Sequence, residues 1–204
     1  MEIKNINLTN CGYIYCKSCF YSCQDGLRED ITYQFSVGVN NLVGEIDSGN
    51  WGISCLISMY PYFSPLEKGL VFLPHEAMVN GETWSLSKLS KYSCYLDEQY
   101  PLFNTKKTVK KLVAQGLKSN KSTVLPESIR DMFHIDLERF ERPLSGVGNE
   151  VFRAMAAIGY SHGKQVYCFP WLSKMRFDYY HGNMTDLLSI LESLQKIVIL
   201  PVGK

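Results

Sequence analysis

Residues 41–59, NLVGEIDSGNWGISCLISM, limit more than any other stretch what this chain can fold into. An apolar run precedes Gly44, a short polar turn separates Gly44 from Gly49, and apolar residues at helical spacing follow. The run consists of Phe35, Val37, Val39, Leu42 and Val43. This order predicts a strand, a glycine-bounded loop and a helix. Backbone N–H groups and a helix N-terminus then point at one small volume, which is how a phosphate-binding loop is built.

The loop lacks the side chains that usually accompany this backbone. The phosphate-loop motif reads G-x-x-x-x-G-K-[ST], and here the lysine position is Asn50 and the hydroxyl position is Trp51. Asp47 and Ser48 lie between the two glycines, and the Asp47 carboxylate would repel a phosphate. Two unit charges about 4 Å apart repel by roughly 4 kcal/mol at an effective dielectric near 20, whereas one hydrogen bond returns about 1 kcal/mol. The residues alone leave two interpretations: a phosphate loop without its chemistry, or a glycine-rich turn of an ordinary α/β protein.

Length and charge narrow the class of protein. The 204 residues suffice for one domain with a core, and a formal net charge of +1 argues against a general electrostatic grip on nucleic acid. No apolar run approaches the roughly 18 residues that a membrane span needs, and the N-terminal residues lack the apolar core of a signal peptide. We therefore expect a cytoplasmic protein that reaches a membrane only through a partner.

The cysteines allow two interpretations. Cys11, Cys16, Cys19 and Cys23 form a cluster that could ligate zinc or an iron–sulfur cluster. The cluster has one C-x-x-C pair and no nearby histidine, and its intervening aromatic and apolar residues predict a strand, on which Cys16 and Cys19 face opposite sides. We therefore expect buried free thiols in a reducing cytosol and no metal ligands. A metal protein that uses this cysteine cluster is kept as a hypothesis ranked below the two that are given at the end of this subsection.

The remaining segments predict an alternation of strands and helices in one domain, residues 1–204. Short strands predict an antiparallel lobe over about residues 1–39 and 69–92, including a hairpin at Asn80-Gly81. Residues 105–142 predict a small helical insert, whose lysines form either a solvated face or a basic docking face. We expect a helix to start at Thr185 and the apolar IVIL to form a central parallel strand.

The order of these segments resembles an ABC-type ATP-binding domain over almost the whole chain. GEIDSGNWG is similar to the phosphate loop of this family, DEQYPLF to its glutamine loop, and LSGVG to its LSGGQ signature. QVYCFPWLS resembles the second Walker strand and the residues after it. ILESLQKIVILPVGK resembles the segment that leads into the strand before the switch histidine. The resemblance implies an α/β fold of the P-loop NTPase type: a mainly parallel sheet flanked by helices, with an N-terminal antiparallel β lobe and a small helical insert. The nucleotide-binding positions that it implies are Gly44, Asp47, Ser48, Gly49, Asn50, Trp51, Gln99 (or Glu98), Leu144, Ser145 and Gly146.

The departures from the family pattern concern its charged residues, so that the Walker motifs are degenerate. The family's phosphate-binding lysine and metal-binding hydroxyl correspond to Asn50 and Trp51. The Asp-Glu pair that holds metal and orients water corresponds to Pro170 and Trp171, and the switch histidine falls near Gly203. Phosphoryl transfer depends on positioned charges. We therefore expect no catalytic residue and no resident cofactor, with ATP and Mg²⁺ bound weakly at most.

The signature-like segment is the one functional element of the family pattern that needs no charged side chain. The family's signature acts on ATP held by a partner subunit through a serine hydroxyl, backbone N–H groups and a helix N-terminus, which Leu144-Ser145-Gly146 still offers. The plainer interpretation is that Ser145 caps the helix that starts near Asn149. The first hypothesis is thus a pseudo-ATPase that serves another ABC-type ATPase subunit or a membrane permease, with a homodimer also open. The alternative is an ATP-binding subunit of an ABC transporter that still binds or hydrolyses ATP with unusual residues.

Overall fold

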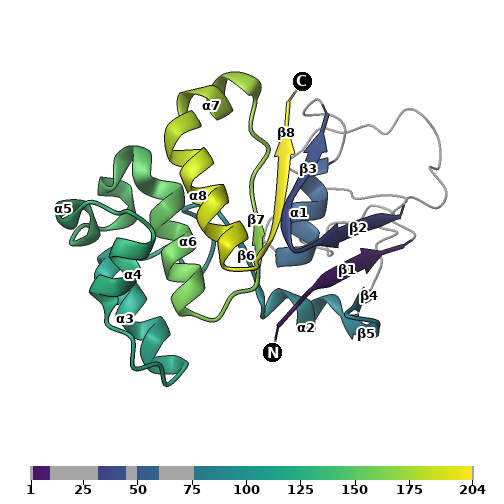
Figure 1. The fold of residues 1–204 in the computed structure, drawn as a ribbon, viewed down its shortest axis with the longest axis horizontal. Helices are drawn as coiled ribbons and strands as arrows, with labels where there is room; N and C mark the ends of the chain where they lie inside the picture. Colours follow the sequence, from purple (N-terminus) through teal and green to yellow (C-terminus); the bar gives the residue numbers. More distant parts are fainter. Residues whose placement is uncertain (1, 10–31, 45–49, 60–75, 204) are drawn as a thin grey trace.

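The computed structural model describes residues 2–9, 32–44, 50–59 and 76–203. Within these ranges the chain forms a parallel sheet flanked by helices and a separate antiparallel sheet, which confirms the expected fold class (Figure 1). The helices are α1 (Asn50–Ser58), α2 (Leu86–Ser90), α3 (Val109–Ser119), α4 (Pro126–Met132), α5 (Leu137–Phe140), α6 (Val151–Ser161), α7 (Lys174–Tyr179) and α8 (His181–Ser193). None of the helices in this part of the chain combines the length and hydropathy that crossing a bilayer requires.

The parallel sheet has the order β3-β8-β7-β6. Its strands are β3 (Gly38–Val43), β8 (Ile197–Val202), β7 (Val166–Cys168) and β6 (Ser93–Tyr95). β8 lies between β3 and β7, and the side chains of its first four residues are at most 1% exposed. A strand that pairs on both edges and carries helices on both faces can be apolar at every position. The prediction of a central parallel strand at IVIL is therefore confirmed.

Helices cover the parallel sheet on two faces. Successive side chains of a strand point to opposite faces, and β7 shows the result. Tyr167 faces α6, because a Cβ on Gly159 would lie 3.2 Å from Tyr167 Cε1. α1 also packs against β6, β7 and β8. α8 packs on α6, β8 and β3, so α6 and α8 share one layer and α1 forms the other (Figure 1).

The antiparallel sheet has the order β2-β1-β4-β5. Its strands are β2 (Tyr33–Ser36), β1 (Asn5–Leu8), β4 (Glu76–Val79) and β5 (Glu82–Ser85). The predicted hairpin at Asn80-Gly81 is confirmed: both residues have positive φ, 51° and 82°, as a two-residue turn requires. Asn80 also accepts a hydrogen bond from Lys4 N at 2.8 Å, which ties the turn to the start of β1.

Two expectations about element bounds are wrong. The single apolar run before Gly44 splits into β2 and β3, which belong to different sheets, because the chain turns at Gly38 with φ 101°. The helix expected to start at Thr185 starts four residues earlier, at His181. Its apolar stripe begins with Met184, which is 1% exposed and precedes Leu187 and Leu191 on the buried face.

The helices α3, α4 and α5 follow β6 and precede α6 along the chain. α3 buries its apolar residues Val109, Leu112 and Val113, as their helical spacing predicts. Thr108 caps α3 by accepting a hydrogen bond from Lys111 N, and Pro126 opens α4. Lys110 forms ion pairs with Glu127 at 3.1 Å and Glu141 at 2.8 Å. The charge of this lysine is therefore partly balanced by acids from α4 and from the residue after α5.

Candidate functional site

The carboxyl ends of the four parallel strands lie at one edge of the sheet, called here the carboxyl edge, where open α/β sheets bind ligands. Gly44 follows β3, and its N–H donates to the carbonyl oxygen of Val202 at 2.9 Å. α1 begins at Asn50, so the strand and helix on either side of the glycine loop are where the sequence predicts them. The loop itself (Asp47, Ser48 and Gly49) lies outside the described residues, as do the side chains of Asn50 and Trp51. Phosphate binding by the loop stays a prediction.

The segment after β7 continues along β8 toward the same edge. Backbone N–H groups of Phe169 and Leu172 donate to carbonyl oxygens of Ile199 and Pro201 at 2.9 and 3.0 Å. Gly203 N–H donates back to the carbonyl oxygen of Leu172 at 2.9 Å. This ladder fixes the position of Trp171, which lies between its first two bonds.

Trp171 packs against the paired ends of β3 and β8. Its indole Nε1–H donates to the carbonyl oxygen of Gly44 at 3.1 Å. On its other side, a Cβ added to Gly203 would lie 3.2 Å from Trp171 Cζ2, so the ring packs closely against the end of β8. At the positions where the family resemblance places acids and a switch histidine, the structure therefore has a half-buried indole and a glycine.

The segment that resembles the glutamine loop follows β6. Leu96 N–H donates to the carbonyl oxygen of Cys168 at 2.8 Å, and Asp97 Oδ1 accepts the N–H of Gln99 at 2.9 Å. Gln99 and Glu98 are exposed, whereas Tyr100 is buried and its hydroxyl donates to the carbonyl oxygen of Ser93 at 3.4 Å. Gln99 is thus held at the carboxyl edge by a turn, and its role in nucleotide binding remains a prediction.

The signature-like turn, Leu144–Gly146, is a 3-10 turn ahead of α6. Leu144 is 4% exposed and anchors the turn in the core, while Ser145 and Gly146 are exposed. Gly148 follows with φ 68°, and a Cβ there would meet no atom within 4 Å. α6 starts at Val151 without a side-chain cap, so the interpretation of Ser145 as its cap is wrong. Within the turn, the Gly146 N–H donates to the carbonyl oxygen of Pro143 at 2.8 Å, and a Cβ on Gly146 would lie 3.5 Å from Arg142 Cβ, so the open space lies beside Gly148.

The structure describes three of the seven cysteines. Cys55, Cys94 and Cys168 are buried thiols, and burial raises the pKa of Cys94 to about 12. Thiols of this kind are protonated and unreactive at neutral pH. The remaining four, Cys11, Cys16, Cys19 and Cys23, lie outside the described residues. Among the residues that are described, no three His, Cys, Asp or Glu side chains group as metal ligands would.

A cavity of about 490 Å³ lies away from the carboxyl edge, where α1, α2 and α6 end. Its lining residues are Ser58, Met59, Ser90, Tyr100, Pro101, Leu102, His162 and Lys164. Lys164 Nζ donates to the carbonyl oxygen of Lys91 at 2.8 Å, at the end of α2, and burial lowers the pKa of Lys164. Burial also lowers the pKa of His162, which follows α6 directly. The sequence alone predicts that Lys164 places its charge at the end of its own helix, α6. Only the tertiary structure brings it to the end of α2.

No family model matches the sequence, and no curated protein matches it either. Solved structures do match. The chain is 18% identical to a putative ABC transporter ATP-binding protein from Pyrococcus furiosus, with a TM-score of 0.61 over 98% of this chain and 90% of that one. It is 12% identical to a bacterial Atm1-family ABC exporter with ATP bound, with a TM-score of 0.61 over 99% of this chain and 34% of the exporter. It is also 12% identical to cbiO1 from Clostridium perfringens, part of the cbiONQ ABC transporter complex, with a TM-score of 0.58 over 100% of this chain and 79% of cbiO1. The chain therefore has the fold of an ABC-type ATP-binding domain.

Proposed function

From the fold of an ABC-type ATP-binding domain, we propose that this chain is a pseudo-ATPase: it does not process ATP itself but serves a partner that does. The partner is a competent ABC-type ATPase subunit, alone or with a membrane permease. In that assembly the signature-like turn, Leu144–Gly146, contacts the nucleotide held by the partner.

The observation that carries the proposal is the position of Trp171 at the carboxyl edge. Its indole donates to the Gly44 carbonyl oxygen and packs against Gly203, at the place where phosphoryl transfer needs acids, metal and a polarising side chain. An indole supplies one N–H donor and no charge, and here that donor is already engaged. Asn50 also stands where the resemblance places the phosphate-binding lysine, so the charge of that lysine is missing from the loop.

The exposure of the signature-like turn supports the second half of the proposal. Ser145 and Gly146 are exposed, and the space beside Gly148 is open, so a ligand on another subunit can reach the turn. A hydroxyl donates to phosphate without a charged side chain, and Ser145 offers one at the surface, whereas the Gly146 N–H already donates to the Pro143 carbonyl oxygen. Two copies of this chain would pair each turn with a loop that lacks lysine, so the proposal favours a different subunit as partner. The description of cbiO1 as part of a transporter complex supports a partner of this kind.

Titration calorimetry of Mg-ATP into the isolated chain tests the first half. We expect no saturable heat and a Kd weaker than about 1 mM, because Asp47 repels the phosphates and no lysine compensates. A variant that combines Asp47→Gly with Asn50→Lys should bind more tightly than the parent chain. Micromolar binding by the parent, accompanied by turnover, would contradict the proposal and favour an ATP-binding subunit that works with unusual residues.

A substitution in the signature-like turn tests the second half in the complex with the partner ATPase. We expect Ser145→Glu to lower the ATP turnover of the complex at least about tenfold, because a carboxylate about 4 Å from a phosphate costs several kcal/mol. The control is Ser119→Glu, at the exposed end of α3. Equal turnover in both variants would show that the turn does not contact the partner's nucleotide.

A further inference from the structure

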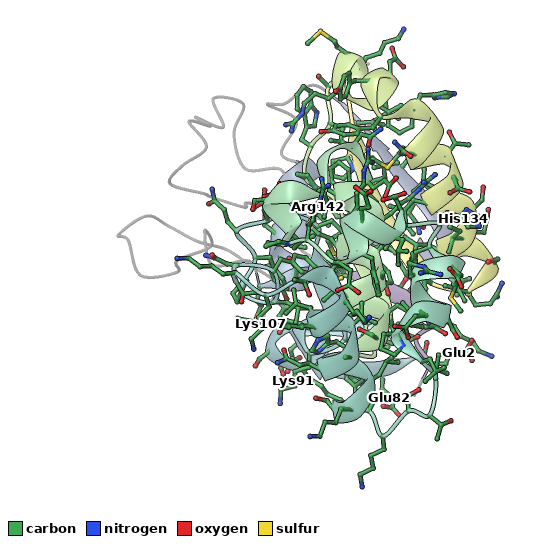
Figure 2. All side chains as sticks on the ribbon, turned by 90° about the vertical axis from the view of Figure 1, so that its left-hand side faces the viewer. Glu2, Glu82, Lys91, Lys107, His134 and Arg142 are labelled. Atoms are coloured by element: carbon green, nitrogen blue, oxygen red, sulfur yellow. The ribbon has the colours of Figure 1, made fainter. Side chains whose placement is uncertain are left out.

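Three charged or polar side chains from three separate segments meet in the Asp186 cluster, defined as His134, Arg153 and Asp186. Asp186 in α8 accepts from Arg153 Nη2 in α6 at 2.6 Å, and its carboxylate lies 3.0 Å from His134 Nδ1. His134 lies in the turn between α4 and α5, on the surface beside α8 (Figure 2). The carbonyl oxygen of His134 accepts from Arg153 Nη1 at 3.2 Å, so Arg153 contacts both other members of the cluster.

The cluster depends on Asp186 for its charge balance. The Arg153 side chain is only 13% exposed, and its Nε has no hydrogen-bond partner. A buried guanidinium without a counter-ion is strongly disfavoured, and Asp186 is the carboxylate that the structure places against it. His134 adopts φ 50°, an unfavourable conformation for a residue other than glycine, which the contacts to Arg153 and Asp186 help to hold.

The position of the cluster links two parts of the fold. On one side is the segment of residues 134–150, which carries the signature-like turn and meets the cluster through His134. On the other side is α8, which leads into β8 and so belongs to the parallel-sheet core. A second ion pair, Arg139 with Glu150 at 2.9 Å, joins α5 to the residue before α6 and does not involve α8. Of these two ion pairs, only Arg153–Asp186 reaches α8, and it acts together with Phe140, Leu144 and Val147, which are buried in the core.

We propose that Asp186 is a positioning residue that fixes the segment carrying the signature-like turn, residues 134–150, against the parallel-sheet core. Without its carboxylate, Arg153 loses its counter-ion and His134 loses its ring contact. The segment then opens locally while the sheet remains folded. The role of this turn in contacting a nucleotide rests on the proposed function. The positioning by Asp186 does not, because it is a property of the isolated chain.

Hydrogen–deuterium exchange of the isolated chain, read by mass spectrometry, tests the inference. In Asp186→Asn we expect peptides from residues 134–150 to exchange about tenfold faster, with β7 and β8 changed less than about twofold. Glu192→Gln is the matched control, since it removes the same charge from the same helix at an exposed residue. It should leave both regions unchanged. Because no nucleotide or partner is present, the result is independent of whether the chain binds ATP.

A second variant covers the case in which Asp186→Asn does not fold. His134→Asn removes the ring contact and keeps the Arg153–Asp186 pair, and asparagine tolerates positive φ. We expect about threefold faster exchange in residues 134–150 and an unchanged sheet. Unchanged exchange of this segment in a folded Asp186→Asn protein would overturn the inference. So would an equal rise in the segment and in β8 for either variant, because Asp186 would then support only global stability.

Discussion

Replacing Trp171 with alanine is expected to lower the free energy of unfolding by about 3 kcal/mol. Truncating a buried tryptophan costs roughly 3–5 kcal/mol, and the low end applies because Trp171 is half-buried. The variant loses the packing against Gly203 and the hydrogen bond to the Gly44 carbonyl oxygen. Urea unfolding followed by circular dichroism measures the change.

The Trp171→Phe variant separates the two contributions of this side chain. Phenylalanine keeps most of the apolar contact and removes the indole N–H, so we expect a loss of only about 1 kcal/mol, the usual value of one hydrogen bond. Losses below about 0.5 kcal/mol in both variants would contradict the packing of the indole against the paired ends of β3 and β8.

The second large effect is expected at Gly116, where α3 packs on the end of α6. A Cβ at Gly116 would lie 2.7 Å from the Ser161 carbonyl carbon and 2.6 Å from both Ser161 Oγ and His162 Cδ2. A backbone atom cannot move aside as a flexible side chain can, so Gly116→Ala must separate the two helices. Overpacking costs up to about 3 kcal/mol, and alanine returns roughly 1 kcal/mol through its helix propensity. We expect a net loss of about 2 kcal/mol in urea unfolding.

Gly182 offers a matched control for this substitution. It lies in the first turn of α8, is exposed, and a Cβ there would meet no atom within 4 Å. Gly182→Ala should therefore be neutral or stabilising by about 0.5–1 kcal/mol. If the two alanine variants have the same stability, the close contact between α3 and α6 is not present in solution.

Elements with a strong local signal could be predicted from the sequence. The Asn80-Gly81 pair defines its hairpin because both residues tolerate positive φ. Pro126 starts α4 because its ring fixes a helical φ and the first turn needs no N–H partner. The run IVIL defines a central strand because only a strand covered on both faces can be apolar throughout.

Features that depend on contacts between distant residues could not be predicted. The split between β2 and β3 at Gly38 has no local signal beyond one glycine, because the division of an apolar run between two sheets depends on which strands pair with each half. The early start of α8 needs Met184 to face the core, which is a packing outcome. Lys164 reaches the end of α2, more than seventy residues away in the chain, for the same reason.

The candidate site shows the same division. The sequence by itself determined a prediction about chemistry, because side-chain chemistry is read directly from residue identity: the resemblance aligns Asn50, Trp51, Pro170 and Trp171 with the cation, hydroxyl and acids of the ABC-type domains. Only the tertiary structure decided what fills the carboxyl edge and what stays open. It brings Trp171 against Gly44, leaves Ser145 exposed, and gathers Asp186, Arg153 and His134, because each of these arrangements depends on the pairing of strands and the packing of helices far apart in the chain.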